Sequence, residues 1–232
     1  MSVTLLALDT STQQCSVALA DANGIHLIES ERPRTHADEV LGMVDRLLRT
    51  HDLTLDRLDV IAMVVGPGSF TGLRIGAAVT QGLAFGADLP VIGVSSLATM
   101  ARAAVELNEP CHWIACCLHA REDEYYVAVY CDKGTGIPEP IIADSLMSSA
   151  DIQRLVEELP PEARQHWLAA GSGWRQAALA SVRKSARAVL FDVLGDASIA
   201  AQMARSVPAA DWRDASAALP VYLKDDMDYR KV

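Results

Sequence analysis

The sequence predicts an α/β fold made of two successive units of one type, each with the element order βββαβα. Two observations predict the first unit: apolar residues recur at helical spacing over residues 36–51, and an uninterrupted apolar run follows at residues 60–65. The same succession of strands and helices begins again after Pro110, and this repetition indicates a duplicated architecture.

The first unit opens with a three-stranded antiparallel arrangement. Apolar runs at residues 3–9 and 15–21 predict two strands. The Asn23-Gly24 dipeptide is typical of a tight hairpin turn and leads into a third strand at residues 24–31.

Helices and buried strands then alternate. The helix predicted at 36–51 precedes the apolar run at 60–65, which is typical of a strand covered on both faces. A glycine-rich loop leads into a helix at residues 72–87, and a short strand at 89–94 is followed by a helix at 95–107.

The second unit repeats the order with weaker signals. Strands are expected at 113–118, 125–130 and 137–143, a helix at 149–159 and a strand at 166–170.

A further helix is expected after Gly171-Ser-Gly173, a stretch that is either a plain turn or a nucleoside contact. The only plausible linker, at residues 108–111, places an N-terminal subdomain at 1–108 and a C-terminal one at 109–232.

Composition argues against several functions. The 232 residues include 30 acidic and 20 basic side chains, with a formal net charge of -10, so we expect no direct nucleic-acid binding. Five cysteines without a CxxC pair indicate neither a disulfide framework nor a zinc site, which favours buried thiols in a reducing cytoplasm. No segment has the composition of a membrane span or an export signal.

Catalytic and metal-binding patterns are also missing from the sequence. The six histidines are His26, His36, His51, His112, His119 and His166. No two of them stand three or four residues apart, so the helical metal-ligand pairs are absent and no metal site is expected. A nuclease would need several converging carboxylates, and no hydrolase nucleophile elbow is present, so no catalytic residue is assigned.

The glycine loop at residues 66–76 fails both nucleotide-binding templates. Leu73 stands where a P-loop needs Lys, and Thr71 stands where a dinucleotide fingerprint needs Gly. Small residues recur every four positions at Gly72, Gly76 and Thr80, a spacing that lets another backbone come close. The helix therefore packs against the protein's own sheet or first helix, or it meets a partner subunit.

Asp9-Thr10-Ser11 follows the first strand, where acid and hydroxyl groups could meet a phosphate or its Mg²⁺. The same residues are ordinary turn formers, so the stretch alone is a weak signal.

Several stretches together resemble one family, the TsaB (YeaZ) family of bacterial tRNA threonylcarbamoyladenosine (t6A) biosynthesis. They are Leu8-Asp-Thr-Ser11, the whole loop at 66–76, Ala120-Arg121 with Glu124 and Tyr126, and residues 219–224. The resemblance covers essentially the whole chain. It implies an actin-like ASKHA (RNase H-like) fold with two related subdomains.

The resemblance also implies a non-catalytic scaffold or activator. Its partner would be the paralogue TsaD, which transfers the threonylcarbamoyl group to N6 of adenosine 37 in tRNAs reading ANN codons, and the ATPase TsaE would join the pair. ATP and metal would be bound by these partners, so no cofactor is expected on this chain. The alternative is a stand-alone ASKHA-type ATPase or a peptidase.

Family heterodimers form through helices that match those predicted at 36–51 and after the glycine loop. The partner-binding candidates are Val40, Met43, Val44, Leu47, Gly72, Arg74, Gly76, Val79, Thr80 and Leu83. Which of them face outward is not determined by the pattern. A homodimer is a further expectation in the absence of TsaD, because an exposed apolar helix pair tends to be buried.

Two further expectations concern polar turns. Asp9, Thr10 and Ser11 would form a vestigial phosphate loop. His119 stands where family members commonly have Asp, which argues against a phosphate or metal role for the turn at Arg121.

Overall fold

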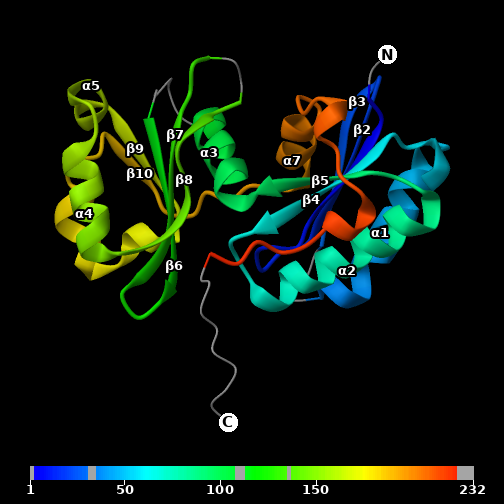
Figure 1. Cartoon of the computed structure of the whole chain (residues 1–232), viewed down its shortest axis with the longest axis horizontal. Helices are drawn as coiled ribbons and strands as arrows, with labels where there is room; N and C mark the ends of the chain where they lie inside the picture. The colour runs from blue at the N-terminus through cyan, green and yellow to red at the C-terminus, as the bar shows by residue number, and fades with distance from the viewer. Residues whose placement is uncertain (1–2, 31–34, 108–112, 135–136, 224–232) are drawn as a thin grey trace, which may run out of the picture. The chain divides into compact units, whose positions relative to one another are not determined.

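The computed structural model describes residues 3–30, 35–107, 113–134 and 137–223 (Figure 1). The chain folds into two compact units, which are described separately. Unit 1 comprises Met1–Thr99 and Gly195–Pro220, and unit 2 comprises Met100–Leu194 and Val221–Val232.

Unit 1 contains a five-stranded sheet in the order β3-β2-β1-β4-β5. The strands are β1 (Leu5–Asp9), β2 (Ser16–Asp21), β3 (Gly24–Glu29), β4 (Val60–Gly66) and β5 (Val91–Ser95). β1, β2 and β3 pair antiparallel, whereas β4 pairs parallel with both β1 and β5.

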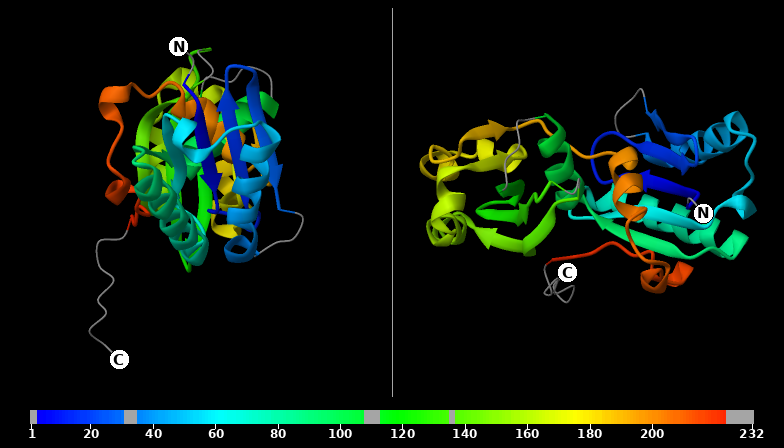
Figure 2. Two further views of the ribbon diagram at one scale, coloured as in Figure 1. Left: turned by 90° about the vertical axis from the view of Figure 1, so that its right-hand side faces the viewer. Right: turned by 90° about the horizontal axis from the view of Figure 1, so that it is seen from above.

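Helices cover both faces of this sheet. The core on one face includes residues of α1 (His36–Thr50) and α2 (Phe70–Ala87), and the core on the other includes residues of α7 (Ala197–Ala204) (Figure 2). Leu6 and Leu8 of β1 belong to the first core, and the alternate residues Leu5 and Ala7 belong to the second.

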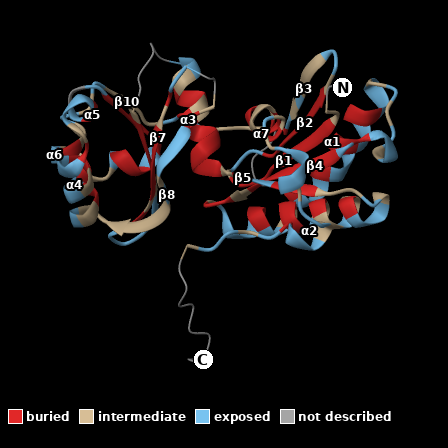
Figure 3. Ribbon diagram, turned by 45° about the horizontal axis from the view of Figure 1, so that its top comes forward, coloured by how far each residue is buried: buried red, intermediate tan, exposed pale blue. Residues whose placement is uncertain are grey.

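The central strands are therefore buried on both sides, while the helices are buried only along their inner faces (Figure 3). A further helix, α3 (Ser96–Leu107), follows β5; its residues up to Thr99 belong to unit 1 and the rest to unit 2. Short 3-10 turns of unit 1 lie at Leu55–Arg57, Ala209–Asp211 and Ala215–Ala217.

The segment Gly195–Pro220 corrects the single boundary at residue 108 that the sequence predicts. Asp196 caps α7 by accepting hydrogen bonds from the amides of Ser198 and Ile199, at 2.7 and 3.1 Å. The Ala197 amide donates to the buried Ser16 hydroxyl at 2.9 Å, which fixes the helix on β2. Four alanines of α7 pack in the core, because small side chains let the helix approach the sheet closely.

Unit 2 contains a five-stranded sheet that, read from β8, has the order β8-β7-β6-β9-β10. This order is equivalent to that of unit 1, strand for strand. The strands are β6 (Trp113–Arg121), β7 (Glu124–Cys131), β8 (Glu139–Ser148), β9 (Trp167–Ala170) and β10 (Ala188–Leu190). β6, β7 and β8 pair antiparallel, and β9 runs parallel to β6 and β10. The duplication predicted from the sequence is confirmed.

The helices of unit 2 differ partly from expectation. α4 (Ser149–Glu158) lies as predicted, whereas α5 (Pro161–Gln165) was not predicted; it begins with a proline, a residue that the first position of a helix tolerates. The single helix expected after residue 173 is replaced by 3-10 turns at Ser172–Arg175 and Ala177–Leu179 and the short α6 (Ala180–Arg183). Among the described residues, no helix is both long and apolar enough to cross a bilayer.

Candidate functional site

The turn after β1 lies directly on the start of α2. The Thr10 hydroxyl donates a hydrogen bond to the Gly72 carbonyl at 2.8 Å. The Ser69 amide donates to the Ser11 carbonyl at 2.7 Å, and the Ser69 hydroxyl caps α2 by accepting from the Gly72 amide at 3.2 Å.

Three glycines make this close approach possible. A Cβ on Gly68 would lie 2.4 Å from the Ser11 carbonyl oxygen, and one on Gly72 would lie 2.0 Å from that of Thr10. On Gly76 it would lie 2.4 Å from the Thr10 hydroxyl. The three glycines therefore allow close contact with the turn after β1 of the same protein, which supports the packing interpretation.

Unit 2 uses the same device. A Cβ on Gly171 would lie 2.4 Å from the Cys117 carbonyl oxygen, and one on Gly173 would lie 2.5 Å from the Cys117 sulfur. Gly171 also has φ +105, a conformation that favours glycine. The plain-turn interpretation thus accounts for both glycines of Gly171-Ser-Gly173.

The predicted phosphate loop, Asp9-Thr10-Ser11, is buried: its side chains are 2%, 1% and 4% exposed. The Asp9 carboxylate accepts from the Ser11 amide at 2.8 Å and from the Ser11 hydroxyl at 2.6 Å. Both hydroxyls of the turn thus donate to acceptors within the protein.

Burial raises the pKa of Asp9 to about 6. Hydrogen bonds from Ser11 oppose this change, the nearby Asp196 adds to it, and His36 opposes it weakly.

The predicted partner-binding residues lie mostly inside unit 1. Val40, Met43, Val44 and Leu47 of α1 are at most 6% exposed and pack in the core under α1 and α2. Gly72, Gly76 and Thr80 of α2 are buried, and Val79 and Leu83 are partly buried against the same core. An amphipathic helix turns its apolar stripe toward its own sheet, so the seven buried residues do not form an outward surface, while Val79 and Leu83 keep part of their surface exposed.

Arg74, the tenth candidate, is exposed. Its guanidinium carbon lies 3.8 Å from the centroid of the Phe70 ring. This cation–π contact gives a physical reason for a basic residue near the N-terminal end of a helix, where the dipole disfavours it.

The outer face of α1 and α2 is a largely different set of residues, which shares only Arg74 with the partner-binding candidates. We define the outer face as Leu41, Gly42, Arg74, Ala78, Gly82, Phe85 and Gly86, all exposed. Phe85 is 85% exposed and Leu41 is 55% exposed. A Cβ on Gly42, Gly82 or Gly86 would meet no atom within 4 Å. The sequence signal for this face is the four-residue spacing of Gly82 and Gly86. The buried glycines Gly72 and Gly76 have the same spacing, so the pattern alone does not separate exposed from buried positions.

The β6–β7 hairpin carries the other family stretch. Arg121 forms an ion pair with Glu124 at 2.7 Å, and His119 donates from Nε2 to the Glu122 carbonyl at 2.9 Å. Both contacts stay within the hairpin and close its turn.

The described cysteines are free thiols, with Cys15, Cys116 and Cys117 buried and Cys131 partly exposed. Burial raises the pKa of Cys15 and of Cys117 to about 12, which keeps both thiols protonated and unreactive at neutral pH. Cys111 lies outside the described residues.

Comparison with known proteins identifies the relatives of this fold. The family model described as TsaD, tRNA N6-adenosine threonylcarbamoyltransferase, matches residues 24–225. TsaB of Escherichia coli, a tRNA threonylcarbamoyladenosine biosynthesis protein, is 34% identical over 98% of this chain and 97% of its own length. TsaB of Haemophilus influenzae is 49% identical over 54% of this chain, a match that spans 52% of that protein. The solved structure of YeaZ from Pseudomonas aeruginosa is 34% identical and superimposes with a TM-score of 0.81 over 95% of this chain and 100% of its own.

Two sheets with the same RNase H-like strand order define an actin-like, ASKHA-type protein. Among such proteins, the chain belongs to the TsaB (YeaZ) family of tRNA threonylcarbamoyladenosine biosynthesis proteins.

Proposed function

We propose that this protein is a non-catalytic subunit that pairs with TsaD through the outer face of α1 and α2. TsaD then transfers the threonylcarbamoyl group to N6 of adenosine 37 in tRNAs reading ANN codons, and TsaE joins the pair. In this proposal ATP and the metal ion of the reaction are bound by the partners, and the complex works in the cytoplasm.

The observation that supports the proposal is a row of exposed residues on the outer face, two of which are small. Arg74, Ala78, Gly82 and Phe85 follow one another at intervals of three or four residues and form one exposed stripe of α2. Gly82 lets another helix approach the backbone, and Phe85 offers a large apolar side chain for burial.

The nature of the partner follows from the family. Because the TsaD family model matches residues 24–225, the proposed partner has the same kind of fold as this chain. The net charge of -10 favours a subunit that leaves tRNA binding to its partner. The buried hydroxyls of the Asp9-Thr10-Ser11 turn favour a subunit without its own nucleotide.

Gly82→Leu tests the proposal. A leucine at this open position blocks helix approach without disturbing the fold of unit 1, and replacing an interior helical glycine removes a cost of about 1 kcal/mol. We expect the affinity for purified TsaD, measured by calorimetry, to fall at least about tenfold, a loss of about 1.4 kcal/mol, while the melting temperature stays the same or rises.

The matched control is Ala150→Leu, an exposed position on α4 of unit 2, which should leave the affinity unchanged. Equal affinity of Gly82→Leu and wild type for TsaD would remove the outer face from the interface. Light scattering on the chain alone, with and without Gly82→Leu, shows whether a homodimer uses the same face. Micromolar ATP binding or ATP hydrolysis by the purified chain would contradict the non-catalytic assignment and favour the ATPase alternative.

A further inference from the structure

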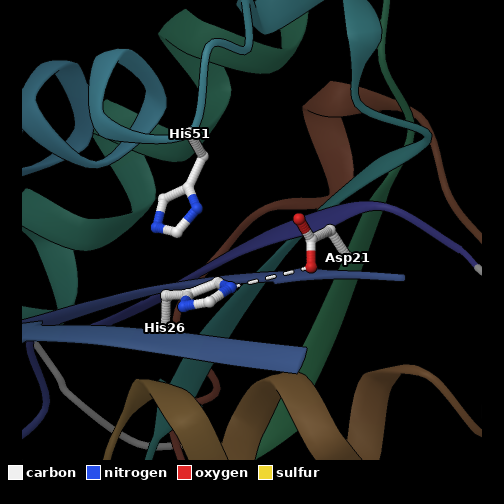
Figure 4. Close-up of side chains that lie close together, drawn as sticks. All are labelled: Asp21, His26 and His51. Carbon is white, nitrogen blue, oxygen red and sulfur yellow. Dashed lines mark ion pairs between the residues drawn. The ribbon is translucent and has the colours of Figure 1, made fainter. Parts of the chain in front are cut away.

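We infer that unit 1 contains a binding site for a divalent transition metal of the zinc class, formed by Asp21, His26 and His51 (Figure 4). Their candidate ligand atoms all lie within 4.8 Å of one another. The proposal does not depend on the proposed pairing with TsaD.

Three separate elements bring the residues together. Asp21 ends β2, His26 lies on β3, and His51 follows the last residue of α1. The strand register pairs Leu19 with His26 and Asp21 with Gly24, so Asp21 and His26 project from the same face of the sheet. Leu19 packs in the core under α1 and α2, which identifies this face as the one that α1 covers.

The donor set matches the chemistry of zinc. Two imidazole nitrogens and one carboxylate oxygen form a three-ligand set that leaves a fourth tetrahedral position open for water. Tetrahedral zinc needs ligand atoms about 3.3 Å apart, so the separations between the ligand atoms must shorten by at most about 1.5 Å. The His26 side chain is 32% exposed and His51 is partly exposed, so both rings have room to rotate.

The present contacts of His26 leave one ligand atom unused. Nε2 of His26 is buried and makes no hydrogen bond to the described residues, because its distance to Oδ1 of Asp21, 3.7 Å, is too long for one. The two imidazole rings lie 3.9 Å apart between centroids at an angle of 35°. A metal ion would satisfy the buried nitrogen and give the close pair of rings a shared partner.

Asp21 is oriented in advance for binding a cation. Its Oδ1 accepts from the amides of Asn23 and Gly24, at 2.7 and 3.1 Å, and this hairpin turn fixes the carboxylate. Burial opposes ionisation of Asp21, but these hydrogen bonds outweigh it and lower the pKa, so the carboxylate is charged at neutral pH. His51 caps the C-terminal end of α1, where the helix dipole favours positive charge.

No metal site was predicted from the sequence, because the prediction considered only pairs of histidines at helical spacing. His26 and His51 are 25 positions apart in the sequence. They come together because α1 packs on β3. A metal ion here would fasten the C-terminal end of α1 to the edge strand of the sheet.

Titration of the metal-free full-length chain with Zn²⁺ alone tests the inference. We expect one equivalent to bind by calorimetry, the melting temperature to rise, and binding to weaken as the pH falls because protons compete for the imidazoles. His51→Ala and Asp21→Asn should each weaken binding at least about tenfold, since even changes outside the ligand shell have effects of that size. Asparagine keeps the acceptor of the hairpin turn, so this variant retains the fold.

His119→Gln, which removes an exposed histidine of unit 2, is the matched control and should bind Zn²⁺ like wild type. Imidazole ¹⁵N resonances of His26 and His51 should shift together on adding Zn²⁺. The inference is overturned if Zn²⁺ does not bind at millimolar concentration, which leaves the cluster as an ion pair, or if His51→Ala and Asp21→Asn bind it as tightly as wild type.

Discussion

The buried Asp9 carboxyl makes the stability of unit 1 depend on pH in an unusual direction. Its pKa is raised from 3.8 to about 6 in the folded protein, chiefly by burial. The folded state therefore holds the Asp9 proton more tightly than the unfolded state, and the contribution of Asp9 to stability decreases as the pH rises from about 4 to about 6. Above that range the ionised carboxylate costs about 3 kcal/mol, at about 1.4 kcal/mol per pKa unit.

Asp9→Asn removes the charge and keeps an oxygen that accepts from the Ser11 amide and hydroxyl. The new amide nitrogen is buried, with a pH-independent cost of about 1 to 3 kcal/mol if it finds no acceptor. The diagnostic quantity is therefore the pH dependence of the difference between variant and wild type. We expect the variant to gain about 2 to 3 kcal/mol relative to wild type between pH 4 and pH 7.5.

Urea unfolding of both proteins at several pH values in this range measures that difference. The charged groups around Asp9 are Asp196, which disfavours its ionisation, and His36, which favours it. A carboxyl ¹³C titration of Asp9 supplies an independent value of the pKa. A difference in unfolding free energy that stays constant from pH 4 to 7.5, or an Asp9 pKa below 5, would refute this reasoning.

Two further predictions concern local structure. Gly76→Ala should destabilise the protein by about 1 to 3 kcal/mol, because its Cβ would lie 2.4 Å from the Thr10 hydroxyl, whereas Gly82→Ala in open space should stabilise it by up to about 1 kcal/mol. Urea unfolding midpoints compare the two, and equal effects would contradict the packing assigned to the glycine loop. Ser148→Ala should cost about 1 kcal/mol by removing the capping box that Ser148 forms with Asp151, and hydrogen exchange should then increase selectively at the start of α4. Unchanged exchange there would show that the cap does not hold this helix end.

The contact between Gly76 and Thr10 also changes the choice of variant for testing the partner-binding surface. Gly76→Leu would be the natural test of a partner-binding glycine stripe, but the stripe of Gly72, Gly76 and Thr80 faces inward. A side chain at position 76 would disturb the fold of unit 1, so failure of that variant to pair with TsaD would not identify an interface residue. Gly82 is the informative position because a side chain there meets open space.

Local sequence patterns predicted the helices and strands in which the spacing of apolar residues reflects burial. The continuous apolar run of β4 and the helical spacing of α1 identify elements covered on one or both sides, and both lie where expected. The same patterns missed α7, which is short and rich in alanine, because it is held on the sheet by a contact with Ser16 far away in the sequence.

The candidate site was harder to predict for a related reason. Apolar spacing locates the buried stripe of a helix, and it therefore selected Val40 and Leu47, which pack in the core. The outer face includes three glycines, and Gly82 and Gly86 have the same four-residue spacing as Gly72 and Gly76. Only the three-dimensional surroundings of each glycine separate a position that contacts Thr10 from one that is open.

The return of Gly195–Pro220 to unit 1 also sets an order of events during synthesis. Residues 100–194 of unit 2 are contiguous in the sequence and are synthesised before α7. Until α7 emerges, the face of the sheet that contains Ala7 and Ala18 has no helix to cover it. A nascent chain ending before residue 195 therefore carries a core of unit 1 that is still open, although every strand of its sheet has already been made.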